Sequence, residues 1–173
     1  MNVAGIENLP AQGGALLAIN HLSRLDGPLI FALLPRPDIT GLVSTKYQKN
    51  PIFRWLINQI GAIWLNREEA DVDALRTARN YLRNGGGIGI APEGTRSQTG
   101  QLIAAKTGAA FLADKAGVPV VPVAIWGTEN AVAQVFRLQR PHIFVRFGEP
   151  FLLPPLRRQH RDADLQHNTD LMM

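Results

Sequence analysis

Short apolar runs alternate along the chain with stretches in which apolar residues recur at helical spacing. Runs such as Gly14-Ala15-Leu16-Leu17-Ala18-Ile19 have the length and the density of apolar side chains that are typical of buried strands. This pattern predicts strands over residues 16–20, 40–44, 62–65, 88–91, 120–126 and 142–147. It predicts helices over residues 28–34, 51–59, 71–84 and 106–115.

The boundaries of these elements carry start and stop signals. Asn50-Pro51 is typical of a helix N-cap followed by a first-turn proline, and Asn84-Gly85 is typical of a helix end. The glycine run at 85–89 follows a helix and leads into a strand, whereas a dinucleotide fingerprint follows a strand and opens a helix, so the run predicts a tight turn. Strands interleaved with helices predict an α/β fold, a single domain with a mostly parallel sheet flanked by helices.

Composition limits the classes of protein to consider. With 173 residues, of which 46% are hydrophobic and 18% charged, the chain is long enough for one filled core and short for two. The absence of cysteine excludes disulfides and thiolate metal ligands. The first residues lack the features of a signal peptide, and no run approaches the ~20 apolar residues of a spanning helix. We therefore expect a chain that is neither exported by its own signal nor membrane-spanning.

The net charge of +4 gives a mild attraction to anionic lipid surfaces and phosphorylated substrates. The arginines are scattered among predicted helices and turns, and no basic stripe is interleaved with aromatic residues, so we expect no nucleic-acid partner. His142, His160 and His167 lack the spacing of metal ligands. We expect no metal.

An imidazole and a carboxylate stand five positions apart in the connection between the first predicted strand and helix, Asn20-His21-Leu22-Ser23-Arg24-Leu25-Asp26. Ligands bind open α/β sheets in the crevice beyond the carboxyl ends of the strands, where this connection is expected to lie. An imidazole with a pKa near ~6.5 can take a proton from a hydroxyl, and a carboxylate on its other nitrogen fixes the tautomer. His21 is therefore a candidate general base oriented by Asp26. The alternative is that His21 caps a turn and Asp26 caps the next helix.

Three further segments extend this pattern. One strand-like stretch ends on Arg67, the turn Ala91-Pro92-Glu93-Gly94-Thr95-Arg96-Ser97 follows a later strand, and an apolar strand at 118–125 carries two prolines. Taken in order with the first segment, these blocks resemble the four motifs of the glycerolipid acyltransferases, the family of 1-acylglycerol-3-phosphate acyltransferase. Ala91 stands where that family usually has an aromatic residue, which leaves the charged part of the motif intact.

The resemblance implies that His21 activates the acceptor hydroxyl and that Asp26 orients it. It also implies that the acyl acceptor and its phosphate are held by Arg67, Glu93, Gly94, Thr95 and Arg96. The residue types agree with this, because a guanidinium can donate to two phosphate oxygens at once and a glycine lets a backbone amide approach closely.

Two questions about the cations stay open at this point. Arg67 could instead form a surface ion pair with Glu68, Glu69 or Glu93. Lys106 could add a third positive charge near the same turn, although an isolated lysine is usually solvated.

The implied activity is transfer of a fatty acyl group from an acyl thioester, acyl-CoA or acyl carrier protein, to the free hydroxyl of a lysophospholipid. We expect 1-acylglycerol-3-phosphate as the acceptor, giving phosphatidate in phospholipid biosynthesis, with no cofactor. Because the chain has no cysteine to carry the acyl group, direct transfer is expected, and a covalent route through Ser23 ranks lower. The alternatives are a catalytically idle lipid- or phosphate-binding domain, an acyltransferase for another acceptor, and a hydrolase.

The predicted helix at 51–59 is apolar on more than one face and has Lys46, Lys49 and Arg54 nearby. This composition favours contact with a membrane surface, and the alternative is a helix buried on two sides. We expect a cytoplasmic protein that associates peripherally with the membrane. Residues 1–150 are expected to form the acyltransferase domain and residues 151–173 a C-terminal tail, in which the resemblance implies the start of a closing helix.

Overall fold

The computed structural model describes residues 1–67, 69 and 71–173. In these residues one sheet has the strand order β1-β7-β6-β2-β5-β3-β4. The strands are Asn2–Ala4 (β1), Ala15–Ile19 (β2), Ile39–Ser44 (β3), Ile63–Leu65 (β4), Gly87–Ile90 (β5), Val120–Trp126 (β6) and Phe144–Phe147 (β7). Only β6 and β7 run antiparallel; the other neighbouring strands are parallel. The predicted α/β fold with a mostly parallel sheet is therefore confirmed.

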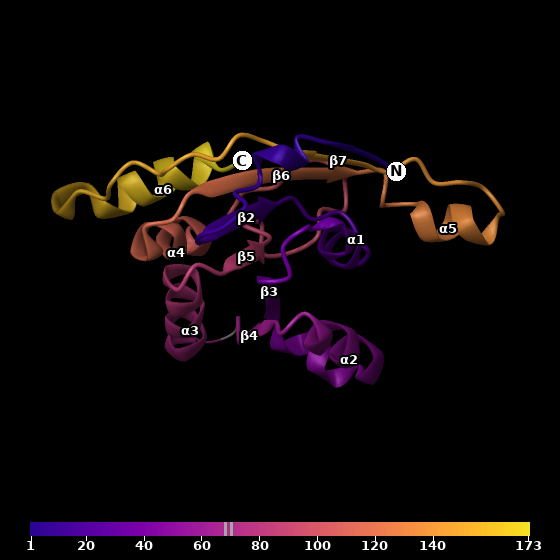
Figure 1. Cartoon of the computed structure of the whole chain (residues 1–173), viewed down its shortest axis with the longest axis horizontal. Coiled ribbons are helices and arrows are strands. Elements are labelled where there is room, and N and C mark those ends of the chain that lie inside the picture. The colour runs from indigo at the N-terminus through magenta and orange to yellow at the C-terminus, as the bar shows by residue number, and fades with distance from the viewer. Residues whose placement is uncertain (68, 70) are drawn as a thin grey trace.

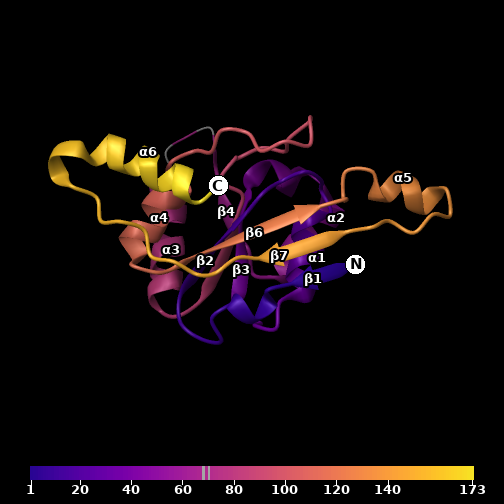
Figure 2. The ribbon, with the colours of Figure 1, turned by 90° about the horizontal axis from the view of Figure 1, so that it is seen from above.

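Helices cover both faces of this sheet (Figure 1). The α-helices are Asp26–Leu33 (α1), Pro51–Gln59 (α2), Val72–Arg83 (α3), Gly108–Ala116 (α4), Ala131–Phe136 (α5) and Arg161–Leu171 (α6). Short 3-10 helices span Ile6–Asn8 (η1), Thr45–Lys49 (η2) and Arg158–His160 (η3). Helices α3, α4 and α6 lie on one side of the sheet and α1 and α2 on the other, while α5 extends beyond the end of β6 (Figures 1 and 2).

The hydrophobic core consists of two clusters, one on each face of the sheet. Leu16 packs with Leu82 of α3 and Leu112 of α4 in one cluster. Leu17 packs with Ile30 of α1 in the other. All five residues of β2 are buried, because this central strand is covered on both faces.

The sequence did not predict β1 or α5. Strand β1 has three exposed residues, and the strand with which it pairs, β7, lies about 140 positions away in the chain. Helix α5 has six residues and no side-chain N-cap. Both lack the local signals from which an element can be predicted.

Two predicted boundaries also shift. The helix expected from residue 28 begins at Asp26. The helix expected from residue 106 begins at Gly108, because the Lys106 amide still donates to the Pro92 carbonyl (2.9 Å) and so belongs to the preceding loop.

Helix α2 has its predicted cap, because the Asn50 side chain accepts from the amides of Ile52 (3.0 Å) and Phe53 (3.2 Å). None of its residues is buried, and Ile52 and Trp55 are 68% and 62% exposed. The alternative of a helix buried on two sides is therefore wrong. In the part of the chain that the structure describes, no helix has the length and hydropathy needed to cross a bilayer.

The C-terminal tail contains α6, which lies against α4. The Arg161 guanidinium sits 5.5 Å from the centroid of the Phe111 ring of α4, and Met172 joins the core beside it. The division of the chain at residue 150 stays a prediction.

Candidate active site

The predicted pair of His21 and Asp26 is assembled beyond the carboxyl end of β2. His21 follows the strand, and Asp26 is the first residue of α1. The His21 Nδ1 atom lies 2.9 Å from the Asp26 Oδ2 atom. Since a carboxylate only accepts hydrogen bonds, this contact assigns the proton of a neutral imidazole to Nδ1 and leaves Nε2 free to accept.

The Asp26 side chain is only 1% exposed, and its carboxylate takes part in four hydrogen bonds. Its Oδ2 atom also accepts from the amides of Leu22 and Ser23, both at 2.7 Å. Its Oδ1 atom accepts from the hydroxyl of Thr128 at 2.6 Å. Burial by itself would raise the pKa of Asp26, but the hydrogen bonds from His21, Ser23, Thr128 and Leu22 outweigh it and leave the pKa below its ordinary value. The carboxylate is therefore ionised at neutral pH.

Thr128 is a contributor that sequence reasoning missed. It is itself 1% exposed and follows β6, the strand next to β2. Neither its residue type nor its distance from Asp26 in the sequence marks it. The only signal would have been its place just beyond the carboxyl end of a strand adjacent to β2.

Asn20 fixes the end of β2 against β6. Its side-chain amide donates to the Ile125 carbonyl (2.9 Å) and accepts from the Ile125 amide (2.7 Å). These two bonds extend the pairing of the strands by one residue and so set where the His21 loop begins.

Glu93 lies behind the site, only 2% exposed. Its Oε1 atom accepts from the His21 amide (2.9 Å) and its Oε2 atom from the Ile103 amide (3.2 Å). The Ser97 amide returns a hydrogen bond of 2.8 Å to the His21 carbonyl. This geometry makes Glu93 a support for the His21 loop, while the role as a ligand for the acceptor stays a prediction.

Gly94 shapes the turn at 91–97, which carries the third motif. Its φ of +69° is in the left-handed region that favours glycine, and its amide closes the turn on the Ala91 carbonyl (3.0 Å). A Cβ atom added here would meet the Lys106 side chain at 3.2 Å. The Gly94 carbonyl accepts a hydrogen bond from the Arg67 guanidinium, so the two motif segments are in contact.

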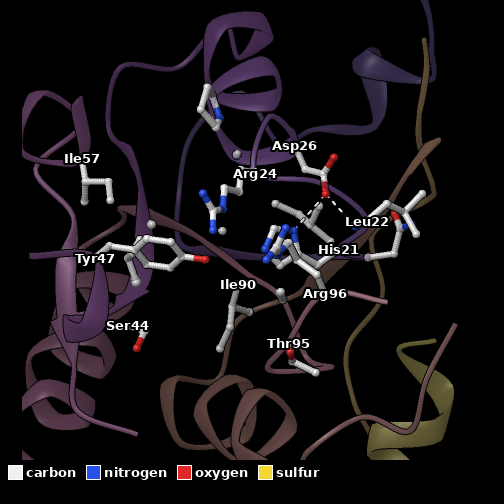
Figure 3. Close-up of a pocket in the computed structure, with 18 of the residues that line it drawn as sticks. His21, Leu22, Arg24, Asp26, Ser44, Tyr47, Ile57, Ile90, Thr95 and Arg96 are labelled. Atoms are coloured by element: carbon white, nitrogen blue, oxygen red, sulfur yellow. Dashed lines mark hydrogen bonds and ion pairs between the residues drawn. The ribbon is translucent and has the colours of Figure 1, made fainter. Parts of the chain in front are cut away.

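The His21–Asp26 segment and the turn at 91–97 both line one pocket of about 1130 Å³. His21, Asp26, Arg67, Thr95 and Arg96 line it, whereas Glu93 and Gly94 do not. In the close-up view the side chains of His21 and Arg96 project into the pocket, and the Tyr47 hydroxyl and Arg24 are directed into the same space (Figure 3). The pocket continues between α1, α2 and the sheet, where its lining is apolar: Phe31, Leu42, Val43, Phe53, Leu56, Ile57, Ile60 and Ile90.

Four cations line the polar part of the pocket, namely Arg24, Lys46, Arg67 and Arg96. Arg67 and Arg96 were expected here from the motifs, whereas no site role was predicted for Arg24 or Lys46. The signal for Lys46 was its place two residues after β3, at the same edge of the sheet as His21. Arg24 lies over the Phe53 ring of α2, with the guanidinium carbon 5.9 Å from the ring centroid.

Arg67 is held by the Gly94 carbonyl rather than by a carboxylate. Of its suggested ion-pair partners, Glu68 lies outside the described residues, and within the described chain neither Glu69 nor Glu93 pairs with it. Although Arg67 is exposed as a whole residue, desolvation lowers the pKa of its guanidinium, and Tyr47 opposes this shift. Because a guanidinium is a far stronger base than any group that titrates near neutral pH, Arg67 stays charged there.

No metal-binding cluster accompanies these residues. Within residues 1–67, 69 and 71–173, no group of three or more His, Asp or Glu side chains is arranged to hold an ion.

Comparison with known proteins identifies the class of protein that this fold and site define. The model of the acyltransferase family matches residues 1–126, and the chain belongs to that family.

Among the relatives, a chloroplastic 1-acyl-sn-glycerol-3-phosphate acyltransferase, LPAT1 of Arabidopsis thaliana, is 36% identical over 74% of this chain and 36% of its own length. The 1-acyl-sn-glycerol-3-phosphate acyltransferase of Borreliella burgdorferi is 31% identical over 74% of this chain and 52% of its own length. This chain thus spans about a third to a half of these relatives.

A solved structure has the same fold. The crystal structure of the 1-acyl-sn-glycerophosphate acyltransferase PlsC from Thermotoga maritima matches with a TM-score of 0.71 and 28% identity. The match covers 99% of this chain and 68% of that one.

Proposed function

We propose that this chain transfers a fatty acyl group from an acyl thioester to the free hydroxyl of a lysophospholipid, with 1-acylglycerol-3-phosphate as the acceptor. The observation that carries the proposal is the oriented His21–Asp26 pair opening on a pocket with a cationic end and an apolar end. The names of the relatives support the choice of acceptor.

The reaction is direct. The Nε2 atom of His21 takes the proton of the acceptor hydroxyl, and the oxygen attacks the thioester carbonyl carbon. The tetrahedral intermediate collapses as the carbon–sulfur bond breaks, and the thiolate takes the proton back from Nε2. Ionised Asp26 stabilises the imidazolium that exists between these steps.

The cations hold the acceptor phosphate. Arg67 and Arg96 each present a planar fork of donors, and Lys46 and Arg24 add charge at the same end of the pocket. The apolar part of the pocket between α1 and α2 takes an acyl chain, because aliphatic side chains line it.

We also propose that the protein works at a membrane surface, through α2. Ile52, Trp55 and Leu56 are exposed on this helix, and Lys46, Lys49 and Arg54 flank them. Apolar side chains beside cations are typical of helices that lie in the lipid interface. Trp55→Ser is expected to lower binding to anionic vesicles. Phe53 is a poorer choice for this test, because its ring packs edge-on against Tyr47.

The test of the proposed activity is release of thiol from acyl-CoA in the presence of lysophosphatidate. We expect release that depends on the acceptor and is abolished by His21→Ala, with the acylated product seen by mass spectrometry. Release without acceptor would indicate a hydrolase, and no release from a lipid-binding wild type would indicate an idle domain. Repeating the assay with an acylated carrier protein identifies the donor.

A matched variant tests the covalent alternative. The Ser23 hydroxyl accepts from the Leu25 amide (3.3 Å) within the His21 loop. Ser23→Ala is therefore expected to retain most of the activity, and a loss as large as that of His21→Ala would contradict direct transfer.

A further inference from the structure

Helix α5 and the segment that follows it, residues 131–142, form an arm with an unusual concentration of exposed apolar side chains. Val132, Val135, Phe136 and Leu138 are all exposed, and Phe136 and Leu138 reach 86% and 96%. Single exposed apolar residues are common, but four within seven positions form a patch of the kind that marks an interaction site.

The arm projects from the body of the protein on the side of the sheet that carries the pocket. Figures 1 and 2 show it extending beyond α1, at the same end as α2. Its base is anchored, because Ala131 is 2% exposed and Glu129 and Asn130 line the pocket. Thr128, just before the arm, bonds to Asp26. The arm therefore starts at the candidate active site.

The tip of the arm holds a defined shape. The Gln139 amide donates to the Gln134 carbonyl (2.9 Å) and the Leu138 amide to the Val135 carbonyl (2.9 Å), which closes the end of α5. Leu138 has a φ of +58°, at a helix-end position that glycine usually occupies. The chain thus keeps a large apolar side chain in solvent where a glycine would be free of strain.

The charge of this region indicates the kind of partner. From residue 130 to residue 148 the sequence has no Asp or Glu, and it has Arg137, Arg140 and Arg146. Arg137 and Arg140 are exposed, and their side chains have no ion pair among the described residues. Apolar side chains interspersed with unpaired cations fit a bilayer that contains anionic lipid. Two copies joined arm to arm would instead bring like charges together.

We propose that the arm is a second lipid-docking element, separate from α2. Phe136 and Leu138 insert into the bilayer, and Arg137 and Arg140 contact anionic headgroups. With α2 on the other side of α1, the two contacts hold the pocket against the membrane. The inference rests on the proposed function, in which the acceptor is drawn from that surface.

The experiment is co-sedimentation of the full chain with vesicles of phosphatidylcholine, alone or mixed with phosphatidylglycerol. Phe136→Ser with Leu138→Ser is expected to weaken binding to the mixed vesicles about tenfold or more, since the insertion of both apolar side chains is lost. Arg137→Gln and Arg140→Gln are expected to weaken it about fivefold each, and only on the mixed vesicles.

The matched controls are Leu152→Ser and Arg158→Gln, an exposed leucine and an exposed arginine in the tail. Both are expected to bind vesicles like the wild type. Binding that is unchanged in the arm variants overturns the proposal. So does a loss of self-association or of binding to an acidic protein in those variants while vesicle binding stays intact.

Thiol release with a short-chain, water-soluble lysophosphatidate separates this proposal from the proposed function. The arm variants are expected to keep full activity on that substrate. If the wild type releases thiol and the arm variants still bind vesicles, the arm proposal is wrong and the proposed function stands. If the arm variants lose vesicle binding but the wild type releases no thiol, the proposed function is wrong and the arm still docks on lipid.

Discussion

The two sides of the sheet differ in what their helices bury. Helices α3 and α4 place Ala78, Leu82, Ala109 and Leu112 in a closed cluster against the sheet. On the other side α1 contributes Ile30 to the core, but α2 buries nothing and α5 buries only Ala131. The side with α3 and α4 is thus closed by its helices, while the other side has a core cluster of its own and also keeps a pocket and two exposed apolar helices. The proposed function accounts for this difference, because a pocket that admits a substrate must stay open to solvent.

The largest effect on activity is expected from the pocket side. His21→Ala removes the proposed proton acceptor and should lower the rate of thiol release by about 10²- to 10⁴-fold. The His21 side chain is partly exposed and packs in neither core cluster, so the melting temperature should change little. Kinetics and thermal unfolding of the same sample measure both quantities. A large fall in melting temperature would remove the distinction between the two sides.

The closed side should behave in the opposite way. Leu82→Ala, at a position only 1% exposed on α3, should lower the free energy of unfolding by about 2–5 kcal/mol, through lost burial and the cavity left behind. Val72→Ala on the same helix is the control, since Val72 is exposed and should change stability by no more than about 0.5 kcal/mol. Urea titrations measure both, and equal effects would contradict the assignment of the core.

Thr128 is buried and bonds to Asp26, so it tests whether one residue can serve both the stability of the fold and the activity. Thr128→Val removes the hydrogen bond to Asp26, and we expect kcat to fall about tenfold with KM nearly unchanged, because the loss of one bond to a charged group reaches the base through its orienting carboxylate. Thr128→Ser should restore most of the rate. If the serine variant stays as slow as the valine variant, packing rather than the hydroxyl is responsible.

The smallest expected effect is a pH dependence of stability. The pKa of Asp26 in the folded chain lies below its ordinary value of 3.8, so its ionised form stabilises the fold. This contribution is fully present above pH 3.8 and is lost as the pH falls through the lower folded pKa. In urea titrations below pH 3.8, the unfolding free energy should decrease more steeply for the wild type than for Asp26→Asn. Equal slopes would contradict the shift.

The sequence was sufficient wherever a signal is local. The apolar run of β2, the Asn50 cap and the alternation of strands and helices each depend on neighbouring residues, and the predicted fold followed from them. Five positions separate His21 from Asp26, so their contact at the end of a strand could also be predicted. The resemblance to known motifs supplied Arg67 and Arg96, which the structure brings to the same pocket as His21.

What could not be predicted depends on contacts between distant segments. Thr128 reaches Asp26 across 102 positions, and β1 pairs with a strand at the other end of the chain. The resemblance implied that Glu93 holds the acceptor, and only the fold reveals that both of its oxygens accept hydrogen bonds from backbone amides. The sequence pattern identifies residue types, while burial determines which charged side chains face the pocket.

The two backbone contacts of Glu93 have a practical consequence for redesign. Because this carboxylate and the Ser97 amide hold the His21 segment from behind, we expect that Thr95 and Arg96 can be exchanged without displacing the His21 imidazole. Residues 93 and 97 thus hold the His21 segment, while residues 95 and 96 between them line the pocket. Libraries that vary positions 95 and 96 while keeping 93 and 97 are the natural route to new acceptor preferences.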